Sequence, residues 1–518
     1  MVKIQKPKSN KNMKSLFNHT IDSKSLEKAS SELWEILQSK INYLPKNDQK
    51  TVELAFIQMT LAHGEVRRKS GEFYIIHPTF ATLILTDFHL DKDTLAACLL
   101  HDVPEDTNVT LKEIKNDFGA EIAFLVEGVT KLSQVRYQGE DRYSENLRRM
   151  FMAMSQDLRV IFIKLADRLH NLSTLKHVDI SKQKRIAKES LEIYAPIAER
   201  LGMSYFRGAI EDACFPFIYP EIYKKFIFDS DLIIEKRQKT LDKISKKIKK
   251  ILQKCKMPYS QIQGRAKKYY SLYKKIQEKK YGVEEVYDLV ALRLITNSVE
   301  DCYEILACLH RHFEPIPNRI KDYILRPKLN GYQSLHTTVR DPENNLIFEI
   351  QIRTNQMNDF AEYGVAAHWA YKEKIEINKT EQLENIISPQ TYKWLSELIE
   401  LGQENWGEEE YLKHVKLDLF QDRIFVMTPK NDPIDLPIGA SPLDFAYKIH
   451  QCLGEKASMA KVNGEMVKLS SQLKNGDVVE IITDKRQKPN EKWLLWVKTT
   501  QAAKQIRHFL KKQNKLEN

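Results

Sequence analysis

The chain has 518 residues, which at roughly 150 residues per domain suggests three or four domains. Gly (17) and Pro (18) are too sparse for a collagen-like or low-complexity chain, and the six cysteines form no CxxC pair, which leaves a zinc ribbon without support. Lys and Arg number 81 against 70 Asp and Glu, and the formal charge of +11 points to an anionic partner such as a nucleotide, RNA or a membrane surface.

Residues 1–22 are polar and basic and are predicted to form a disordered N-terminus. A signal peptide would need an apolar run behind them, which the sequence does not have, and stretches such as 94–100 are far too short to span a membrane. Six cysteines in so long a chain fit a reducing compartment better than a disulfide scaffold. We therefore expect a cytoplasmic protein that makes no membrane contact.

Residues 23–200 carry helical patterns and no good run of alternating strand residues, which predicts an all-α domain. Its first amphipathic helix is expected from about Ser23 to Leu44. Residues 201–261 are also helical in pattern and are predicted to form a helical linker. The linker ends in a charged stretch with apolar residues at three- and four-residue steps.

Three separated segments of the all-α domain combine histidine with acidic residues: RRKSGEFYIIHP (67–78), LLHDVPEDT (99–107) and FIKLADRLHNL (162–172). Two His and two Asp make a mixed nitrogen and oxygen ligand set, which suits Mn²⁺ or Fe²⁺ better than a thiolate zinc site does. His101 and Asp102 are adjacent, so both reach one ion only near a helix end or kink, which Pro104 supplies. Asn171 follows Asp167 by one turn, on the same face.

The alternative for these segments is structural, because His-Asp pairs are common and a lone pair is weak evidence. Here, however, His101 and Asp102 directly follow the apolar stretch LAACLL, and Glu105 and Asp106 come three residues after that pair. Four polar groups at the end of a buried helix are costly without a ligand. The pattern favours metal-dependent hydrolysis, in which the ion lowers the pKa of a bound water while Glu105 and Asp106 orient that water and relay its proton.

The character of the sequence changes at Ile262, and residues 262–374 are predicted to form an α+β domain. Strands are expected within 286–296, 335–340 and 346–354. A helix is expected to begin near Ser298, where Asp301 completes the spacing of a capping box.

The run LIFEIQIRT (346–354) alternates, so that Glu349, Gln351 and Arg353 share one face and the apolar residues share the other. A carboxylate, an amide and a guanidinium in line are not a normal solvent face beside a core. Asp288 lies in another β-rich run. If the sheet brings these two carboxylates together, they form a Mg²⁺ site of the kind that handles nucleoside triphosphates.

Basic and aromatic residues surround this strand, and Arg and Lys match phosphate oxygens. Tyr332, after Asn330-Gly331, is placed to stack on a base. The alternative is a solvated basic helix, which we prefer for the lysines late in KKYYSLYKKIQEKK (267–280). That alternative is harder to maintain for RPKLNGYQSLHTT (326–338), where basic, turn, aromatic and His residues converge without a helical period.

Residues 375–421 are mostly polar and charged and are predicted to form a second helical linker. Short strands return in 422–484 with the turn signals Asn463-Gly464 and Asn475-Gly476, which predicts a small β-rich module. Residues 485–518 are predicted to form a basic helical tail.

The segments HGEVRRKSGEFYIIHP, HDVPEDT and KLADRLHNL resemble the HD-superfamily hydrolase half of the long RelA/SpoT-type alarmone enzymes. That half removes the 3′-pyrophosphate of (p)ppGpp with Mn²⁺. The resemblance implies a set of metal ligands and a catalytic acidic pair, respectively His77, His101, Asp102 and Asp167, and Glu105 and Asp106. It also implies contacts with the guanine nucleotide by Arg68, Lys69, Ser70 and Asn171. Pro104 stands where the family usually has an aliphatic residue.

The region from GRAKKYYSLYKK through KDYILRPKLNGYQSLHTTV and EIQIRT to AEYGVAAHWAYK resembles the synthetase half of the same family, a nucleotidyltransferase-like domain. The implied reaction transfers the β,γ-pyrophosphate of ATP to the 3′-OH of GDP or GTP. Asp288 and Glu349 would hold Mg²⁺, and Glu349 could also serve as the base. The implied contacts are Arg265 and Arg293 around adenine, Lys267 on the ATP phosphate, Tyr332 stacked on guanine, Lys328, Asn330 and His336 around the acceptor nucleotide, and Gln351 beside Glu349.

A short motif between these segments bears on whether both halves work. NRIKD (318–322) matches the Arg-x-Lys-Asp version of a family motif through Arg319, Lys321 and Asp322, with Asn318 where relatives usually have Gly. The resemblance implies that members with this version are bifunctional, whereas synthetase-only members carry an acidic version.

The segments DRIFVMTPK, PIGASPLDFAYKIHQCLG, AKVNGEMVKL and LKNGDVVEIIT resemble the TGS module, a small β-grasp-like domain. In ribosome-associated relatives this module contacts the 3′ end of uncharged tRNA, and His450 matches the contacting histidine. The resemblance therefore implies a weak tRNA or ribosome contact, while a buried core histidine is the open alternative for His450.

Together these features predict a bifunctional enzyme of the stringent response that makes (p)ppGpp from ATP and GDP or GTP and also hydrolyses it. One alternative is a hydrolase whose synthetase domain only binds nucleotide for regulation, against which Asp288, Glu349 and Tyr332 argue. Another is a stress regulator without activity that binds tRNA or the ribosome through the TGS module. The complete His and Asp set of the helical domain argues against that second alternative.

Overall fold

The computed structural model describes residues 25–133, 152–154, 156–266, 268–279, 290–328, 330–367, 396, 423–430 and 432–514. The chain divides into two compact units, one of residues 1–136 with 148–399 and one of 137–147 with 400–518. The expected disordered N-terminus and most of the second linker lie outside the described residues, as do Lys267 and Asp288. Within the described ranges, no helix is both long and apolar enough to cross a membrane.

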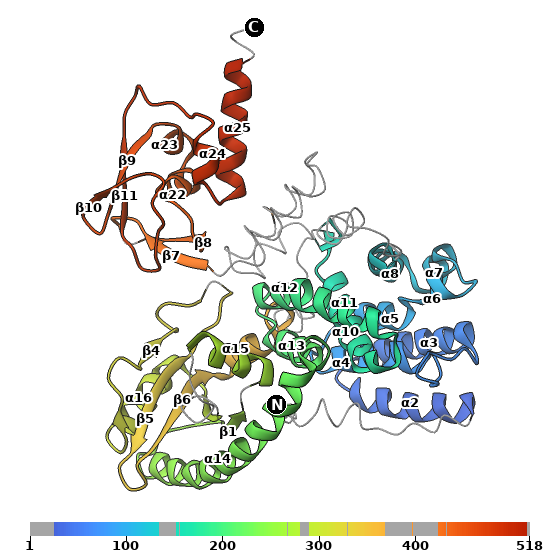
Figure 1. Cartoon of the computed structure of the whole chain (residues 1–518). Helices are drawn as coiled ribbons and strands as arrows, with labels where there is room; N and C mark the ends of the chain where they lie inside the picture. Colours follow the sequence, from blue (N-terminus) through green and yellow to red (C-terminus); the bar gives the residue numbers. More distant parts are fainter. Residues whose placement is uncertain are drawn as a thin grey trace. The chain divides into compact units, whose positions relative to one another are not determined.

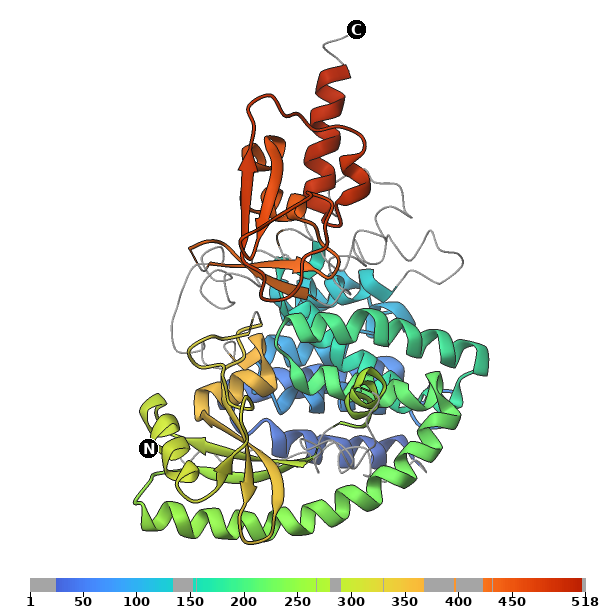
Figure 2. The same ribbon diagram turned by 60° about the vertical axis from the view of Figure 1, so that its left-hand side comes forward.

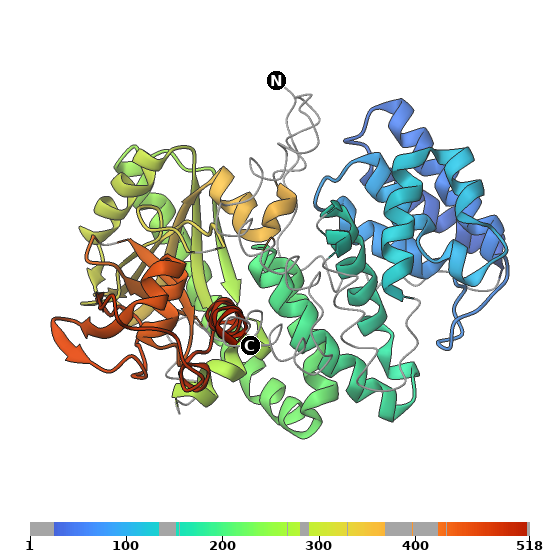
Figure 3. The same ribbon diagram turned by 90° about the horizontal axis from the view of Figure 1, so that it is seen from above.

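The first unit begins with a helical body, which confirms the all-α expectation (Figure 1). Its elements are α2 (Leu26–Lys40), α3 (Lys46–His63), α4 (Ile76–Thr86), α5 (Lys92–Leu100), α6 (Val103–Asp106), α7 (Leu111–Phe118), α8 (Ala120–Ser133), α10 (Arg159–Ser173), η1 (Leu175–His177), α11 (Ile180–Glu189), η2 (Ser190–Tyr194), α12 (Ala195–Arg200) and α13 (Ser204–Ile218). Figure 3 shows these blue to green helices gathered side by side.

Helices α4, α5 and α10 form the centre of this body. Every residue of α4 is buried, as is α5 from Thr94 onward, because their sequences are mostly apolar and carry no charged residue in these stretches. Polar residues on these helices are therefore carried into the interior. Helix α5 ends at Leu100, and α6 has Pro104 in its first turn. The helical path is therefore interrupted at His101 and Asp102, as the sequence predicts.

Helix α13 lies in the stretch expected to be a linker, yet it packs against α10 and α11 and buries Phe206, Ile210 and Phe215. The long helix α14 (Pro220–Lys254) then leads into the α+β region. The strands of this region are β1 (Gln261–Ala266), β2 (Val290–Thr296), β3 (Glu314–Pro315), β4 (Lys321–Asp322), β5 (Leu335–Asp341) and β6 (Leu346–Thr354). Its helices are α15 (Tyr269–Lys279), α16 (Val299–His310) and α17 (Asn355–Tyr363).

The sheet has the order β1-β2-β6-β5-β3, with β4 also paired to β5. Strands β2 and β6 run parallel, and the other pairs are antiparallel. Ser298 and Asp301 form a reciprocal capping box at the start of α16, as predicted.

One face of the sheet is apolar and is covered by α14 and α16. Figure 2 shows α14 passing along the sheet. The core beneath these helices includes Leu292, Leu294, Val339, Phe348, Ile350 and Ile352 from the strands. Because neighbouring residues of a strand point to opposite faces, the residues between them present a polar face on the other side.

The helical body and the α+β region meet at two glycines. The N–H of Val365 donates to the carbonyl of Leu201 over 3.0 Å. A Cβ added to Gly364 would lie only 2.2 Å from that same carbonyl oxygen, and one added to Gly202 would lie 3.2 Å from the Cα of Gly364. The backbones approach so closely that only glycine fits at Gly364.

Two further contacts join the same parts of the first unit. The Asp212 carboxylate on α13 accepts from the N–H of Tyr270 in the first turn of α15 over 3.0 Å. The Phe88 ring packs edge-on against Tyr363, at the end of α17, with 5.0 Å between ring centroids.

The second unit contains the hairpin of β7 (Arg423–Met427) and β8 (Pro433–Pro437) and the sheet β10-β9-β11. The strands of that sheet are β9 (Ala457–Val462), β10 (Glu465–Val467) and β11 (Val479–Thr483), and its helices are α22 (Pro442–Ile449), α23 (Gln451–Glu455), α24 (Trp493–Trp496) and α25 (Thr500–Asn514). Asn463 and Gly464 turn between β9 and β10 with φ of 53° and 88°, as their sequence predicts. Within the predicted basic tail, residues Thr500–Asn514 form the helix α25.

Candidate functional site

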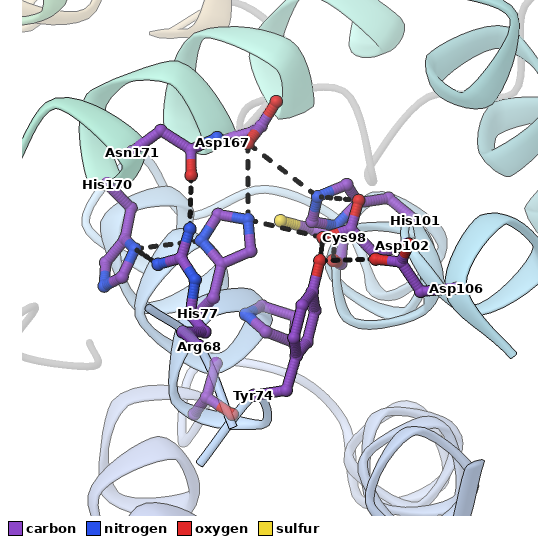
Figure 4. Close-up of polar contacts among 12 residues, drawn as sticks. Arg68, Tyr74, His77, Cys98, His101, Asp102, Asp106, Asp167, His170 and Asn171 are labelled. Carbon is purple, nitrogen blue, oxygen red and sulfur yellow. Dashed lines mark hydrogen bonds and ion pairs between the residues drawn. The ribbon is translucent and has the colours of Figure 1, made fainter. Parts of the chain in front are cut away.

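Four predicted metal ligands from α4, the α5–α6 break and α10 meet in the helical body (Figure 4). Nε2 of His77 lies 3.4 Å from Oδ2 of Asp102 and 3.3 Å from Oδ1 of Asp167. Nε2 of His101 lies 3.2 Å from Oδ1 of Asp102 and 4.0 Å from Oδ1 of Asp167. One ligand atom each from His77, His101 and Asp102 lies within 4.8 Å of the others.

The donor set fits a divalent metal ion. Nδ1 of His101 lies 2.6 Å from the carbonyl of Cys98 and donates to it, so the lone pair of that ring is on Nε2. This Nε2 is buried and makes no hydrogen bond with any described residue. An orphaned buried nitrogen is costly, and a metal ion would satisfy it. Imidazole nitrogens beside carboxylate oxygens are the ligands expected for such an ion.

A buried lysine holds one of the ligands. Nζ of Lys164 lies 2.8 Å from Oδ2 of Asp167, and Nδ2 of Asn171 donates to Oδ1. Burial by itself raises the pKa of Asp167, but the Lys164 ammonium and the nearby histidines hold it well below its ordinary value. Asp167 is therefore ionised and oriented. Sequence reasoning missed Lys164, although a lysine one turn before the aspartate in an apolar helix was a usable signal.

Tyr74 links the ligands to the acidic pair. Its hydroxyl lies 3.0 Å from Oδ2 of Asp102 and 2.5 Å from Oδ2 of Asp106. Burial, and then the charge of Asp102, raises the pKa of Glu105 to about 7, and its Oε1 is buried without a partner among the described residues. The site thus holds a carboxyl group able to carry or release a proton near neutral pH. Tyr74 was also missed, although it precedes His77 by three residues.

Two of the four predicted nucleotide contacts meet beside these ligands. Arg68 donates to Oδ1 of Asn171 over 2.5 Å. Lys69 is exposed, and its Nζ lies 3.7 Å from Asp179. The hydroxyl of Ser70 is buried and makes no hydrogen bond to the part of the chain that the structure describes.

On the polar face of the sheet, a row of side chains runs across the strands, with one residue from each strand. Strand register pairs Gln263 with Arg293, Arg293 with Gln351, Gln351 with His336 and His336 with Lys321. Directly paired residues point to the same face. Five strands therefore contribute one polar residue each to a continuous row.

Glu349 lies beside this row and is held by two of its members. Its Oε1 accepts from Nε2 of Gln351 over 2.8 Å and lies 3.2 Å from Nδ1 of His336. Nε2 of His336 lies 2.8 Å from the hydroxyl of Tyr332, and Nζ of Lys328 lies 5.0 Å from the centroid of the Tyr332 ring. The structure therefore brings five predicted site residues together.

Other predicted residues of the sheet site have protein partners or lie apart. Arg293 is 7% exposed and pairs with Glu362 of α17 over 2.6 Å. Nδ2 of Asn330 donates to the carbonyl of Glu199 over 3.4 Å. Arg319 and Lys321 are exposed, and Arg265 lies on β1 with its side chain outside the description. Sequence reasoning missed Glu362, because α17 carries it to Arg293 from nearly seventy residues away in the chain.

In the second unit, His450 is exposed between α22 and α23, which excludes the buried-core alternative. Its Nδ1 accepts from the N–H of Cys452 over 3.2 Å.

Comparison with known proteins assigns a family model to each region. The HD domain matches residues 54–204, the region found in RelA/SpoT proteins matches 264–376, and the TGS domain matches 424–483. The helical body with its buried His and Asp cluster is thus an HD domain. It is followed by an α+β region and a small TGS domain.

Curated relatives extend these matches over most of the chain. The guanosine-3′,5′-bis(diphosphate) 3′-pyrophosphohydrolase of Aquifex aeolicus is 42% identical over 93% of this chain and 68% of its own length. The bifunctional (p)ppGpp synthase/hydrolase SpoT of Escherichia coli is 41% identical over 92% and 67%. The GTP pyrophosphokinase of Myxococcus xanthus is 41% identical over 91% and 62%. The chain therefore belongs to the RelA/SpoT family and spans about two thirds of the length of these relatives.

A solved structure, the small alarmone synthetase 1 from Bacillus subtilis, is 24% identical over 34% of this chain and 92% of its own. Its TM-score is 0.22, too low to support an inference.

Proposed function

We propose that this chain is a bifunctional alarmone enzyme of the stringent response. One activity transfers pyrophosphate from ATP to the 3′-OH of GDP or GTP, and the other hydrolyses (p)ppGpp to GDP or GTP and pyrophosphate. The observation that carries this proposal is the presence, in one chain of this family, of a buried His and Asp centre and a sheet face built around Glu349. We place the functional parts at 23–200, 262–374 and 422–484, in the cytoplasm.

For hydrolysis, we assign His77, His101, Asp102 and Asp167 to a Mn²⁺ ion. When bound, such an ion would lower the pKa of a water molecule and stabilise negative charge on the phosphate. Asp106, fixed by the Tyr74 hydroxyl, orients the attacking water. Glu105, whose pKa is raised to about 7, takes its proton.

Substrate binding in the hydrolase is assigned to the nearby loop and to α10. Arg68 and Asn171 meet there and present a guanidinium and an amide to the guanine nucleotide. Lys69 and Ser70 complete the contact, and the exposed Lys69 exchanges its ion pair with Asp179 for a phosphate. Arg is suited to this role because its planar donors match phosphate oxygens.

For synthesis, we assign Asp288 and Glu349 to Mg²⁺ and Glu349 also to the proton of the 3′-OH. Gln351 and His336 fix the Glu349 carboxylate, which supports in-line positioning of the two nucleotides. Tyr332 stacks on guanine, with Lys328, Asn330 and His336 around the acceptor nucleotide. Arg265, Lys267 and Arg293 bind ATP, which requires Arg293 to exchange Glu362 for the adenine ring.

The remaining assignments concern regulation and partners. Arg319 and Lys321 are exposed, as groups that meet a nucleotide or select between activities must be. The exposed His450 supports a weak contact of the TGS domain with tRNA on the ribosome. The positive formal charge of +11 favours such anionic partners.

Two incubations test the function. Purified protein is given labelled ATP, GDP and Mg²⁺ in one, and ppGpp and Mn²⁺ in the other, and the nucleotides are resolved by chromatography. We expect ppGpp to form in the first and GDP to form in the second. Hydrolysis without synthesis would support the hydrolase with a regulatory nucleotide-binding domain. If neither product forms, the result would support the alternative of a regulator without activity.

A further inference from the structure

His170, on α10, is buried and belongs to neither the predicted metal ligands nor the predicted nucleotide contacts. It is 3% exposed, and its ring packs against His77 and Phe80 of α4, with centroid distances of 4.9 Å and 5.8 Å. Its Nδ1 lies 2.9 Å from Nδ1 of His77 (Figure 4). A histidine buried against a metal ligand is a candidate for controlling that ligand.

The two Nδ1 atoms can share only one hydrogen, so one ring donates and the other accepts. The position of Arg68 determines which ring is the donor. Its NH1 lies 3.3 Å from the same Nδ1 of His170, and a guanidinium has donors but no acceptor. A hydrogen on Nδ1 of His170 would face the Arg68 donor and leave it without this acceptor, whereas a lone pair there accepts from both Arg68 and the Nδ1–H of His77. Nδ1 of His77 is therefore the donor.

This tautomer sets the direction of the metal-binding nitrogen. A neutral His77 with its hydrogen on Nδ1 has its lone pair on Nε2. Nε2 is the atom that faces Asp102 and Asp167 at 3.4 Å and 3.3 Å. Metal-binding histidines commonly donate their other N–H to an acceptor that fixes the ring, but a carboxylate or carbonyl is the usual acceptor. For the other histidine ligand, His101, the acceptor is the Cys98 carbonyl.

We propose that His170 is a positioning residue of the metal centre, which holds His77 in its metal-binding tautomer by accepting the Nδ1 hydrogen. The proposal rests on the proposed metal site. Because Arg68 donates to the same nitrogen, the nucleotide loop and the ligand share this histidine.

Three variants of the full chain separate acceptance from packing. His170→Phe keeps a ring next to Phe80 but removes the acceptor. His170→Asn places a carbonyl oxygen where Nδ1 was, because both atoms are one bond beyond Cγ. His63→Phe is the matched control, since His63 is also 3% exposed, stacks on Tyr74 and has an Nε2 without a partner among the described residues.

Manganese affinity is measured on metal-free protein by titration with Mn²⁺ and the electron paramagnetic resonance signal of the free ion. We expect His170→Phe to raise the dissociation constant about 10- to 100-fold, the usual cost of losing a ligand-orienting group. His170→Asn should recover most of that loss, and His63→Phe should change affinity less than about twofold. Equal losses in the Phe and Asn variants, or none in either, would overturn the proposal.

The ¹⁵N-histidine spectrum of the unaltered protein loaded with Zn²⁺ provides a test that needs no folded Phe variant. The signals missing from the His170→Asn spectrum belong to His170. Its Nδ1 must lack a hydrogen, and a protonated Nδ1 would contradict the assignment. Neither measurement uses (p)ppGpp, so a failure of the proposed hydrolase activity would be seen separately, as bound metal without turnover.

Discussion

The two candidate sites lie in one compact unit but are built by different means. The helical site gathers residues from α4, the α5–α6 break and α10, and they meet because α4, α5 and α10 pack together. The sheet site is set by strand register, which aligns polar residues across β1, β2, β6, β5 and β4. The helical ligands are also more deeply enclosed, since the side chain of Asp167 is 7% exposed against 17% for Glu349.

The difference shows how each site tolerates charge. A carboxylate buried as deeply as Asp167 needs a partner, and Lys164 provides it. Glu349 is satisfied by an amide and a histidine at a more accessible face. Changes at the helical site should therefore affect both stability and activity, whereas changes at the sheet site should affect mainly activity.

The largest effect is expected from Lys164→Met, which leaves the Asp167 charge without its cation. In excess chelator the free energy of unfolding should fall by about 3–5 kcal/mol, the cost of breaking a buried pair. The lowered pKa of Asp167 contributes stability above the ordinary carboxyl range, and that contribution is lost as pH falls through the folded value. The deficit should therefore shrink toward pH 4 or below, roughly the unfolded carboxyl pKa. Urea titration at several pH values measures this deficit, and one that is constant with pH would contradict the ion-pair explanation.

Next in size is Glu349→Gln, which removes a charge but keeps the shape. Synthesis should fall at least about a hundredfold, the scale for loss of one charge-stabilising group, while hydrolysis and melting temperature change little. Glu343→Gln is the matched control, because this exposed glutamate pairs only at the surface, with Lys247. Both reactions are assayed on each variant, and parallel loss of both activities in folded Glu349→Gln protein would mean that the sites are not separate.

The reciprocal change is Asp102→Ala. Removal of this ligand should lower hydrolysis at least about a hundredfold and leave synthesis intact. Asp117→Ala on the exposed part of α7 serves as the control. Excess chelator should reproduce the loss in unaltered protein, with Mn²⁺ restoring activity better than Zn²⁺. Hydrolysis that continues in chelator would contradict the metal assignment.

A smaller effect is expected where the regions that carry the two sites meet. Gly364→Ala should destabilise the protein about 1–3 kcal/mol more than Gly64→Ala, the usual cost of overpacking. The comparison is matched because both glycines cap helices, with φ and ψ of 59° and −133° in Gly364 and 51° and −134° in Gly64. Only Gly364 has a close neighbour, whereas a Cβ on Gly64 meets nothing within 4 Å. Urea titration compares them, and equal losses would show that backbone strain alone matters.

The smallest effect should come from Tyr74→Phe. The ring and its stacking on His63 remain, but Asp106 loses the hydroxyl that holds it. Hydrolysis should fall about tenfold, within the 10- to 100-fold range for an outer hydrogen bond of a metal site. Initial rates at saturating Mn²⁺ measure the effect, and an unchanged rate would remove Tyr74 from the site.

The sequence predicted the placement of candidate site residues correctly where a local pattern, such as alternation along a strand, determines the direction of the side chains. Alternation along β6 predicts the polar face with Glu349 and Gln351, and Pro104 predicts the break that turns His101 and Asp102 inward. It could not predict that Arg293 would face Glu362, because that pairing depends on how α17 returns across β2 and β6. Tyr74 and His170 act through contacts with other segments of the chain, which no single helical pattern contains. Lys164, in contrast, pairs with Asp167 within α10, at a spacing that the sequence does show.

The joint between Gly202 and Gly364 has a consequence for recombination and engineering. The Val365 N–H bonds to the Leu201 carbonyl at a distance that leaves no room for a side chain on Gly364. A chimera that takes its hydrolase from one relative and its synthetase from another must therefore bring a compatible partner for each glycine. We expect point substitutions to silence the two halves one at a time, whereas an exchange between relatives should require both halves as a matched set.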